Sequence, residues 1–210
     1  MENNFHRTIF IDIEALDEEL DAPIMEVAAV AVESATYRFI DKIDLRVEFE
    51  MRHLSKFRYL GVNKFSPEEW SQYAIPGEDA AKKLSLFFNR HATVEKISKD
   101  GNNYTIPKLA GHNSDSWDAP RIEEWFKKHD CFFHKEMLRT RDTMQKAIWL
   151  FEDNPSIQPP DDYTLKTLAE HLQLDHKPTH RALSDCLATV DLARSLAEFY
   201  RQAPTTKAAA

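Results

Sequence analysis

Two acidic side chains near the start of the chain, Asp12 and Glu14, are the first candidates for chemistry. They lie at the end of a stretch of β-branched and aromatic residues (8–13) that is typical of a buried strand. Side chains two apart on a strand point to the same face, so these carboxylates lie side by side. Two like charges there repel each other and lose hydration unless a cation joins them. A hard divalent cation is one suitable partner; two solvated acids at a strand end explain the pair equally well.

Two further acids and a histidine extend this set. Asp118 opens a predicted helix, where the helix dipole also favours a carboxylate. Asp185 lies in the first turns of the last predicted helix, and His180 precedes that helix in a loop, where an imidazole can reach a water molecule. None of these residues indicates a site by itself, so the hypothesis depends on their arrangement together.

The elements that must position these residues follow from the apolar pattern. Residues 8–13, 24–32 and 36–47 predict three strands joined by short turns, which favours an antiparallel meander. Strands and then helices interleaved with strands indicate one mixed α/β domain over residues 1–204, and residues 205–210 are expected to be a disordered tail or a cloning remnant. The other expected elements are a helix start at Ser66, a hairpin within 93–109, a strand at 109–112, and helices at 77–91, 118–129, 143–151, 165–172 and 181–201.

Composition excludes several classes of protein. Of 210 residues, 42% are hydrophobic and 30% charged, so a folded core is expected. Apolar stretches are shorter than the roughly 18 residues of a membrane helix, and no signal peptide is expected. The 2 cysteines are too few for a disulfide scaffold or a cysteine zinc cage. We therefore expect a cytoplasmic protein with no membrane partner.

Charge limits how this chain could hold a polyanion. It has 27 basic against 35 acidic residues and a formal charge of -8, so its overall field does not attract nucleic acid. Local basic groups or bound cations must supply the attraction. One candidate patch combines Arg46, Arg52, Lys56 and Arg58 with Phe49, Phe57 and Tyr59; a solvated amphipathic segment is the more frequent explanation of such a pattern.

Three segments resemble the motifs of a known family. Residues 10–14 (FIDIE) resemble the first motif of the DnaQ-like 3′–5′ exonucleases, the DEDD superfamily with a ribonuclease-H-like fold. Residues 110–113 (AGHN), followed by Trp117 and Asp118, are similar to the second motif. Residues 180–189 (HRALSDCLAT) are similar to the third in its histidine-containing form, the most specific of the three. The resemblance spans about residues 8–200 and implies an α/β mixed sheet, with three antiparallel strands and then parallel ones, flanked by helices.

This resemblance implies a role for each candidate residue. Four carboxylates would hold two Mg²⁺ or Mn²⁺ ions about 3.5–4 Å apart, and His180 would be the general base. Leu16 would wedge against the terminal base. The implied metal ligands are Asp12, Glu14, Asp118 and Asp185, and the implied substrate contacts are Ala15, Leu16, His112 and Asn113.

The chain departs from the family pattern at two places. Residues 15–17 (ALD) stand where the family has a small segment containing Thr and Gly, which affects how the terminal nucleotide is seated. The second motif carries one extra residue. Asp118 is therefore preferred over Asp115 as the ligand, because Trp117 fills the aromatic place before it.

The function implied is a metal-dependent 3′–5′ exonuclease that releases nucleoside 5′-monophosphates from the 3′ end of DNA. A 3′–5′ exoribonuclease is the alternative enzyme, and a non-catalytic nucleic-acid or polymerase-partner module is the alternative from another class. The acidic charge predicts short or frayed single-stranded 3′ ends as substrates and poor processivity. A polymerase or repair protein and a second copy of the chain are the further partners considered.

Overall fold

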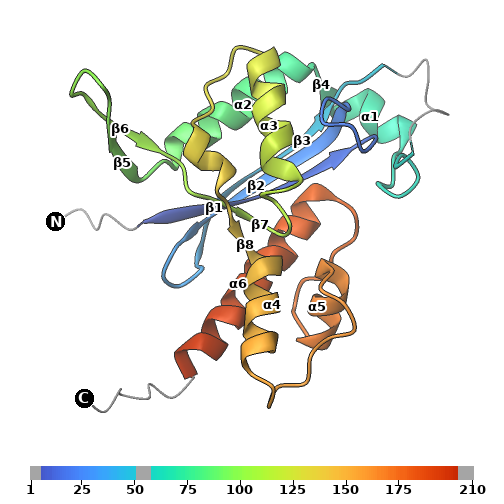
Figure 1. The fold of residues 1–210 in the computed structure, drawn as a ribbon. Helices are drawn as coiled ribbons and strands as arrows, with labels where there is room; N and C mark the ends of the chain where they lie inside the picture. Colours follow the sequence, from blue (N-terminus) through green and yellow to red (C-terminus); the bar gives the residue numbers. More distant parts are fainter. Residues whose placement is uncertain (1–5, 51–57, 203–210) are drawn as a thin grey trace.

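A six-stranded mixed sheet forms the centre of the computed structural model, which describes residues 6–50 and 58–202 (Figure 1). The strand order is β4-β3-β2-β1-β7-β8. Antiparallel pairing joins β1 to β2 and β2 to β3, whereas β7 is parallel to β1 and to β8, and β4 is parallel to β3. The bounds are β1 Arg7–Ala15, β2 Ile24–Glu33, β3 Phe39–Val47, β4 Ala74–Ile75, β7 Leu109–Gly111 and β8 Arg141–Asp142.

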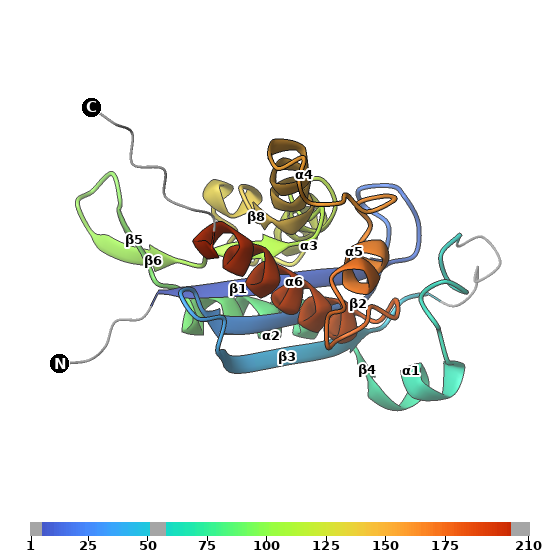
Figure 2. The same ribbon diagram turned by 90° about the horizontal axis from the view of Figure 1, so that it is seen from below.

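Helices cover both faces of this sheet, as the two views show (Figures 1 and 2). On one face, alternate residues of β1 and β2 such as Ile11 and Ala29 pack in one apolar cluster with Leu84 of α2 and Phe126 of α3. The intervening residues, such as Phe10, pack on the other face against α6. The helices are α1 Pro67–Tyr73, α2 Gly77–Arg90, α3 Asp118–Lys128, α4 Thr143–Asp153, α5 Leu165–His171 and α6 Ala182–Gln202, with a short 3₁₀ turn at Lys135–Leu138.

Small side chains let α6 lie directly on the sheet. The Sγ atom of Cys186 lies 3.6 Å from the carbonyl oxygen of Phe10 and 3.5 Å from that of Ala28. All of β2 is buried, which agrees with its nearly continuous apolar sequence. Because α6 is held so close to β1, its first turn is brought to the end of β1 where the predicted site lies.

The predicted elements are confirmed in type, with differences at the ends. The third strand begins at Phe39 rather than at residue 36, because Tyr37 adopts φ 59° in the turn before it. Ser66 caps α1 by accepting a hydrogen bond from the Glu69 amide, as expected. The hairpin forms from β5 Val94–Ile97 and β6 Asn103–Ile106. The two-residue strands β4 and β8 were not predicted, since so short a strand carries no periodicity.

Two sequence predictions concern parts outside this description. The expected tail at 205–210 lies outside the described residues, as does the segment 51–57. Within the described ranges, no helix is both long enough and apolar enough to cross a membrane.

Candidate active site

The candidate site lies where β1 ends. Asp12 and Glu14 share the face of β1 that α6 covers; Asp12 is half-buried and Glu14 is buried. The register of β1 against β2 shifts between Glu14 and Ala15. The two carboxylates that the sequence analysis placed side by side are therefore at the edge of the core rather than in open solvent.

Asp118 reaches this strand end from the first residue of α3. Its Oδ1 accepts a hydrogen bond of 2.9 Å from the backbone N–H of Ile13, the residue between Asp12 and Glu14. Asp118 is only 3% exposed. Asp115, the alternative considered in the sequence analysis, is exposed and accepts a hydrogen bond from its neighbour Ser116. The geometry favours Asp118.

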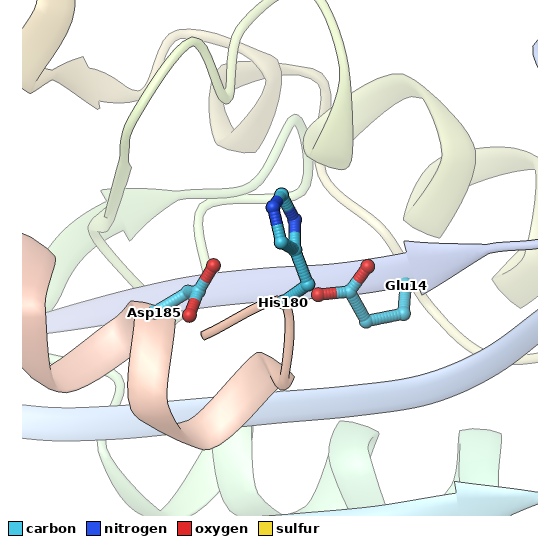
Figure 3. Close-up of side chains that lie close together, drawn as sticks. All are labelled: Glu14, His180 and Asp185. Atoms are coloured by element: carbon cyan, nitrogen blue, oxygen red, sulfur yellow. The ribbon is translucent and has the colours of Figure 1, made fainter. Parts of the chain in front are cut away.

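The first turn of α6 and the loop before it bring the third group of residues. One ligand atom each of Glu14, His180 and Asp185 lies within 4.8 Å of the others (Figure 3). Asp185 also accepts a 2.8 Å hydrogen bond from the Thr179 amide, which ties the loop to the helix. His180 is exposed and adopts φ 56°, a left-handed conformation that turns the chain sharply before α6.

Burial and mutual repulsion dominate the electrostatics of the four carboxylates. Burial, with repulsion from Asp185, raises the pKa of Glu14 to about 8, and burial raises the pKa of Asp118 to about 8. Burial followed by repulsion from Asp118 raises the pKa of Asp12 well above its usual range, and burial raises that of Asp185. The four carboxyl groups resist being ionised at the same time. A hard divalent cation bound among them would favour their ionised forms, and carboxylate oxygens are the ligands that such a cation prefers. The residues present therefore fit the ions that the family resemblance implies.

The sequence analysis did not predict a buried ion-pair network that lies next to this site. Arg181 follows His180, and its Nε donates to Glu26 at 2.9 Å while its Nη2 donates to Glu69 at 2.6 Å. Glu26 is 0% exposed and also lies 3.6 Å from Arg46. A sequence signal existed, because a glutamate inside the apolar stretch of β2 requires a cationic partner. We call this group, Arg181, Glu26, Glu69 and Arg46, the arginine clamp.

The clamp fixes the backbone that carries His180. Its ion pairs connect the start of α6 to β2, through Glu26, and to α1, through Glu69. Glu26 pairs with Glu14 in the β1–β2 register. The same contacts thus hold both the histidine loop and the strand next to the carboxylates.

The predicted substrate contacts are placed differently from the carboxylates. Leu16 is 0% exposed and packs with Met25 and Trp70. The Leu16 side chain thus faces the core in this structure, and its expected contact with the terminal base stays a prediction. Ala15 is buried beside it.

His112 holds its loop rather than facing open solvent. Its Nδ1 lies 3.0 Å from the Thr143 hydroxyl and its Nε2 lies 2.9 Å from the carbonyl oxygen of Tyr163. Burial lowers the pKa of His112, and a ring proton on Nε2 can be donated to the Tyr163 carbonyl oxygen. Asn113 follows in a left-handed turn with φ 58° and is half-buried.

The candidate basic patch at 46–59 is not free to bind phosphate in its described part. Arg46 pairs with Asp44 at 2.6 Å and Glu69 at 2.8 Å, and Arg58 pairs with Glu18. Arg52, Lys56 and Phe57 lie outside the described residues.

Comparison with known proteins gives a family for part of the chain. Residues 102–193 match a family model, RNase_T, described as an exonuclease. This segment of the chain is therefore similar to an exonuclease domain. The match contains the second and third motifs of the DnaQ-like resemblance, which it confirms, while the first motif lies before it on β1. No curated protein matches the chain.

Solved structures share the fold of this chain. E. coli exonuclease I in complex with a dT13 oligonucleotide is 14% identical with a TM-score of 0.68, over 90% of this chain and 40% of that one. A structure of exonuclease I that suggests how processivity is achieved is 13% identical with a TM-score of 0.65, and the match covers 91% of this chain and 41% of that one. A complex of ExoI with SSB-Ct is 13% identical with a TM-score of 0.67, and the match covers 94% of this chain and 42% of that one. The likeness shows that this chain shares the fold of part of exonuclease I, and the chain spans about two fifths of that protein's length.

Proposed function

We propose that this protein is a metal-dependent 3′–5′ exonuclease that removes nucleoside 5′-monophosphates from single-stranded DNA. The observation that carries the proposal is the convergence of Glu14, His180 and Asp185 within 4.8 Å from chain segments far apart in sequence. Asp12 and Asp118 complete the set, because repulsion from Asp118, in addition to burial, raises the pKa of both Asp12 and Glu14. The exonuclease-family match supports the reaction class. The structures of exonuclease I with dT13 and dA16 oligonucleotides support DNA as the substrate.

Each residue of the candidate site has a separate role in the proposed reaction. Asp12, Glu14, Asp118 and Asp185 would hold divalent cations, which when bound polarise a water molecule and neutralise phosphate charge. His180 stands exposed at the edge of this group, where an imidazole nitrogen can accept the proton of the attacking water. The arginine clamp holds the histidine loop in place.

The bond changes follow from that arrangement. The water oxygen forms a bond to the phosphorus of the last phosphodiester as His180 accepts its proton, and the bond from phosphorus to the 3′ oxygen breaks. The shortened strand keeps a 3′ hydroxyl, and the released nucleotide keeps a 5′ phosphate.

Digestion of 5′-labelled single strands tests this proposal. We expect a ladder of progressively shorter labelled DNA in Mg²⁺ or Mn²⁺, and no cleavage in EDTA. A 5′–3′ enzyme would release the labelled mononucleotide at once, and faster cleavage of a matched RNA strand would assign the exoribonuclease alternative instead. Cleavage that continues undiminished in EDTA would contradict the metal-dependent mechanism.

Variants assign the roles within the site. Asp118→Asn should abolish cleavage, while Asp115→Asn, which changes an exposed acid three residues away, should leave it intact. His180→Ala should lower kcat by about 10²-fold, the scale of a lost general base, with His6→Ala as its control. Full activity of His180→Ala at neutral pH would remove the proton-acceptor role.

A further inference from the structure

A second region of the structure combines cations with aromatic rings, on the face where α4 and α6 pack together (Figures 1 and 2). A pocket of about 330 Å³ opens there between β8, α4, α6 and the β2–β3 turn. Its walls include Phe10, Tyr37 and Ala193, with Arg141 and Lys146 as its cations. None of the predicted catalytic residues lines it.

The cations of this pocket have no acidic partner in the described ranges. The ion pairs found among the residues at 6–50 and 58–202 include neither Arg141 nor Lys146. Burial lowers the pKa of Lys146, and the neighbouring cations Arg141 and Arg201 lower it further. Positive charge is therefore concentrated at this place in a chain with a formal charge of -8.

The one carboxylate among the residues that line the pocket, that of Asp142, is engaged at the start of α4. Oδ1 of Asp142 accepts hydrogen bonds from the amides of Met144 and Gln145 at 2.9 and 3.2 Å, and so caps α4. Its Oδ2 is buried and has no hydrogen-bond partner.

Exposed aromatic rings continue the pocket along the two helices. Lys146 lies over the ring of Tyr200, with Nζ 5.4 Å from the centroid. Trp149 follows one turn after Lys146 on α4 and is 61% exposed, and Tyr200 is 46% exposed. Large exposed rings interleaved with cations are the features with which proteins hold single-stranded nucleic acid. We call the set Tyr37, Arg141, Lys146, Trp149 and Tyr200 the α4–α6 patch.

We infer that the α4–α6 patch is an accessory binding site for single-stranded nucleic acid, separate from the catalytic centre. The cations would contact backbone phosphates, and the exposed rings would stack with bases. This inference rests on the proposed function, since it supplies the local attraction that the acidic surface lacks.

The fold sets the length of strand that can use this patch. Asp185 and Tyr200 lie in the same helix 15 positions apart, which at 1.5 Å per residue is about 22 Å. A stacked strand rises about 3.4 Å per nucleotide, so about seven nucleotides are needed to reach from the site to Tyr200 at the far end of the patch. A trinucleotide bound at the site cannot reach Tyr200.

Kinetics on two substrate lengths test the inference. For a 15-mer, Arg141→Glu and Tyr200→Ala should each raise KM about 5- to 10-fold with kcat unchanged, while Tyr200→Ala should leave the KM for a trinucleotide unchanged. The charge control is Lys83→Glu, an exposed lysine of α2 on the opposite face of the sheet. If Arg141→Glu behaves like Lys83→Glu on the 15-mer, or if Tyr200→Ala raises KM as much for the trinucleotide as for the 15-mer, the inference is wrong.

A binding measurement separates this inference from the proposed activity. In EDTA, where no cleavage is expected, the 15-mer should quench tryptophan fluorescence in the parent protein, and Trp149→Phe should remove most of that quenching. Loss of binding affinity with salt should be shallower in Arg141→Glu, by about 0.7 in the log–log slope for one lost contact. If an acidic peptide, and not the 15-mer, causes the Trp149 signal, the patch is a protein-binding site and the inference fails. A parent protein that binds through Trp149 and cleaves nothing would instead refute only the proposed activity.

Discussion

At the scale of residues, the candidate site is a set of carboxylates that the fold forces together at a cost in charge repulsion. Glu14 is only 8% exposed and lies beside Asp185. Burial, together with repulsion from Asp185, raises its pKa to about 8. Groups arranged for function often destabilise the fold that carries them. The stability of the metal-free protein should therefore depend on the ionisation of this group.

Glu14→Gln should stabilise the metal-free protein increasingly as the pH rises. The folded-state pKa of Glu14 exceeds its unfolded value, so its stabilising contribution is present below about pH 4.5 and is lost as the pH rises through about 8. The glutamine cannot ionise. In EDTA we expect the variant and parent to have similar free energies of unfolding at pH 5, and the variant to be more stable by about 1–3 kcal/mol at pH 8. Urea unfolding across this range measures it, and a constant difference at all pH values would contradict the assigned burial.

At the scale of elements, the arginine clamp ties α6 to β2 and α1. Glu26 is fully buried between Arg181, at 2.9 Å, and Arg46, at 3.6 Å. Removing one partner of a buried pair leaves charge without compensation, which costs more than the pair itself contributes. The clamp therefore affects both stability and the position of His180.

Replacing Arg181 should separate these two effects. Arg181→Gln should destabilise the fold by about 1–3 kcal/mol and lower kcat, because Glu26 loses a charged partner and the His180 loop loses its anchor. Adding Glu26→Gln should restore much of the stability but not the kcat. The measurements are urea unfolding and single-turnover rates.

Arg194→Gln is the matched control, because Arg194 pairs with Asp191 at 3.1 Å farther along the same helix. It should leave kcat unchanged. If the double variant regains full kcat together with its stability, the clamp contributes to folding alone.

At the scale of the whole molecule, net charge opposes the proposed substrate. With a formal charge of -8, the grip on a strand depends on bound cations and on the α4–α6 patch. Because the protein then makes few contacts with the phosphates of a bound strand, the strand can dissociate rapidly between cleavage steps.

We therefore expect low processivity. When labelled 30-mers meet the enzyme in the presence of excess unlabelled strand as a trap, each binding event should remove only a few nucleotides. Intermediate lengths should accumulate, and raising the salt concentration should shorten each run. Complete degradation of a 30-mer in one encounter would show that the charge argument is wrong.

The sequence by itself determined the long strands and helices and indicated the candidate metal ligands. Apolar periodicity predicted β1, β2 and the long helices, because burial of one face repeats along the chain. The histidine-containing motif at 180–189 indicated His180 and Asp185, since its residue types and spacing are distinctive. Short elements such as β8 depend on neighbouring strands for their hydrogen bonds, so no local pattern marked them.

Only the tertiary structure decided which polar residues are available. It paired Arg46 with acids, buried Leu16 and engaged both ring nitrogens of His112. It also brought Arg141 and Lys146 into one pocket and placed Lys146 over the ring of Tyr200, from elements that no sequence motif connects. The physical reason is that exposure and partnership are set by contacts between distant segments. A residue type fixes what a side chain can do, and its neighbours in space fix whether it is free to do it.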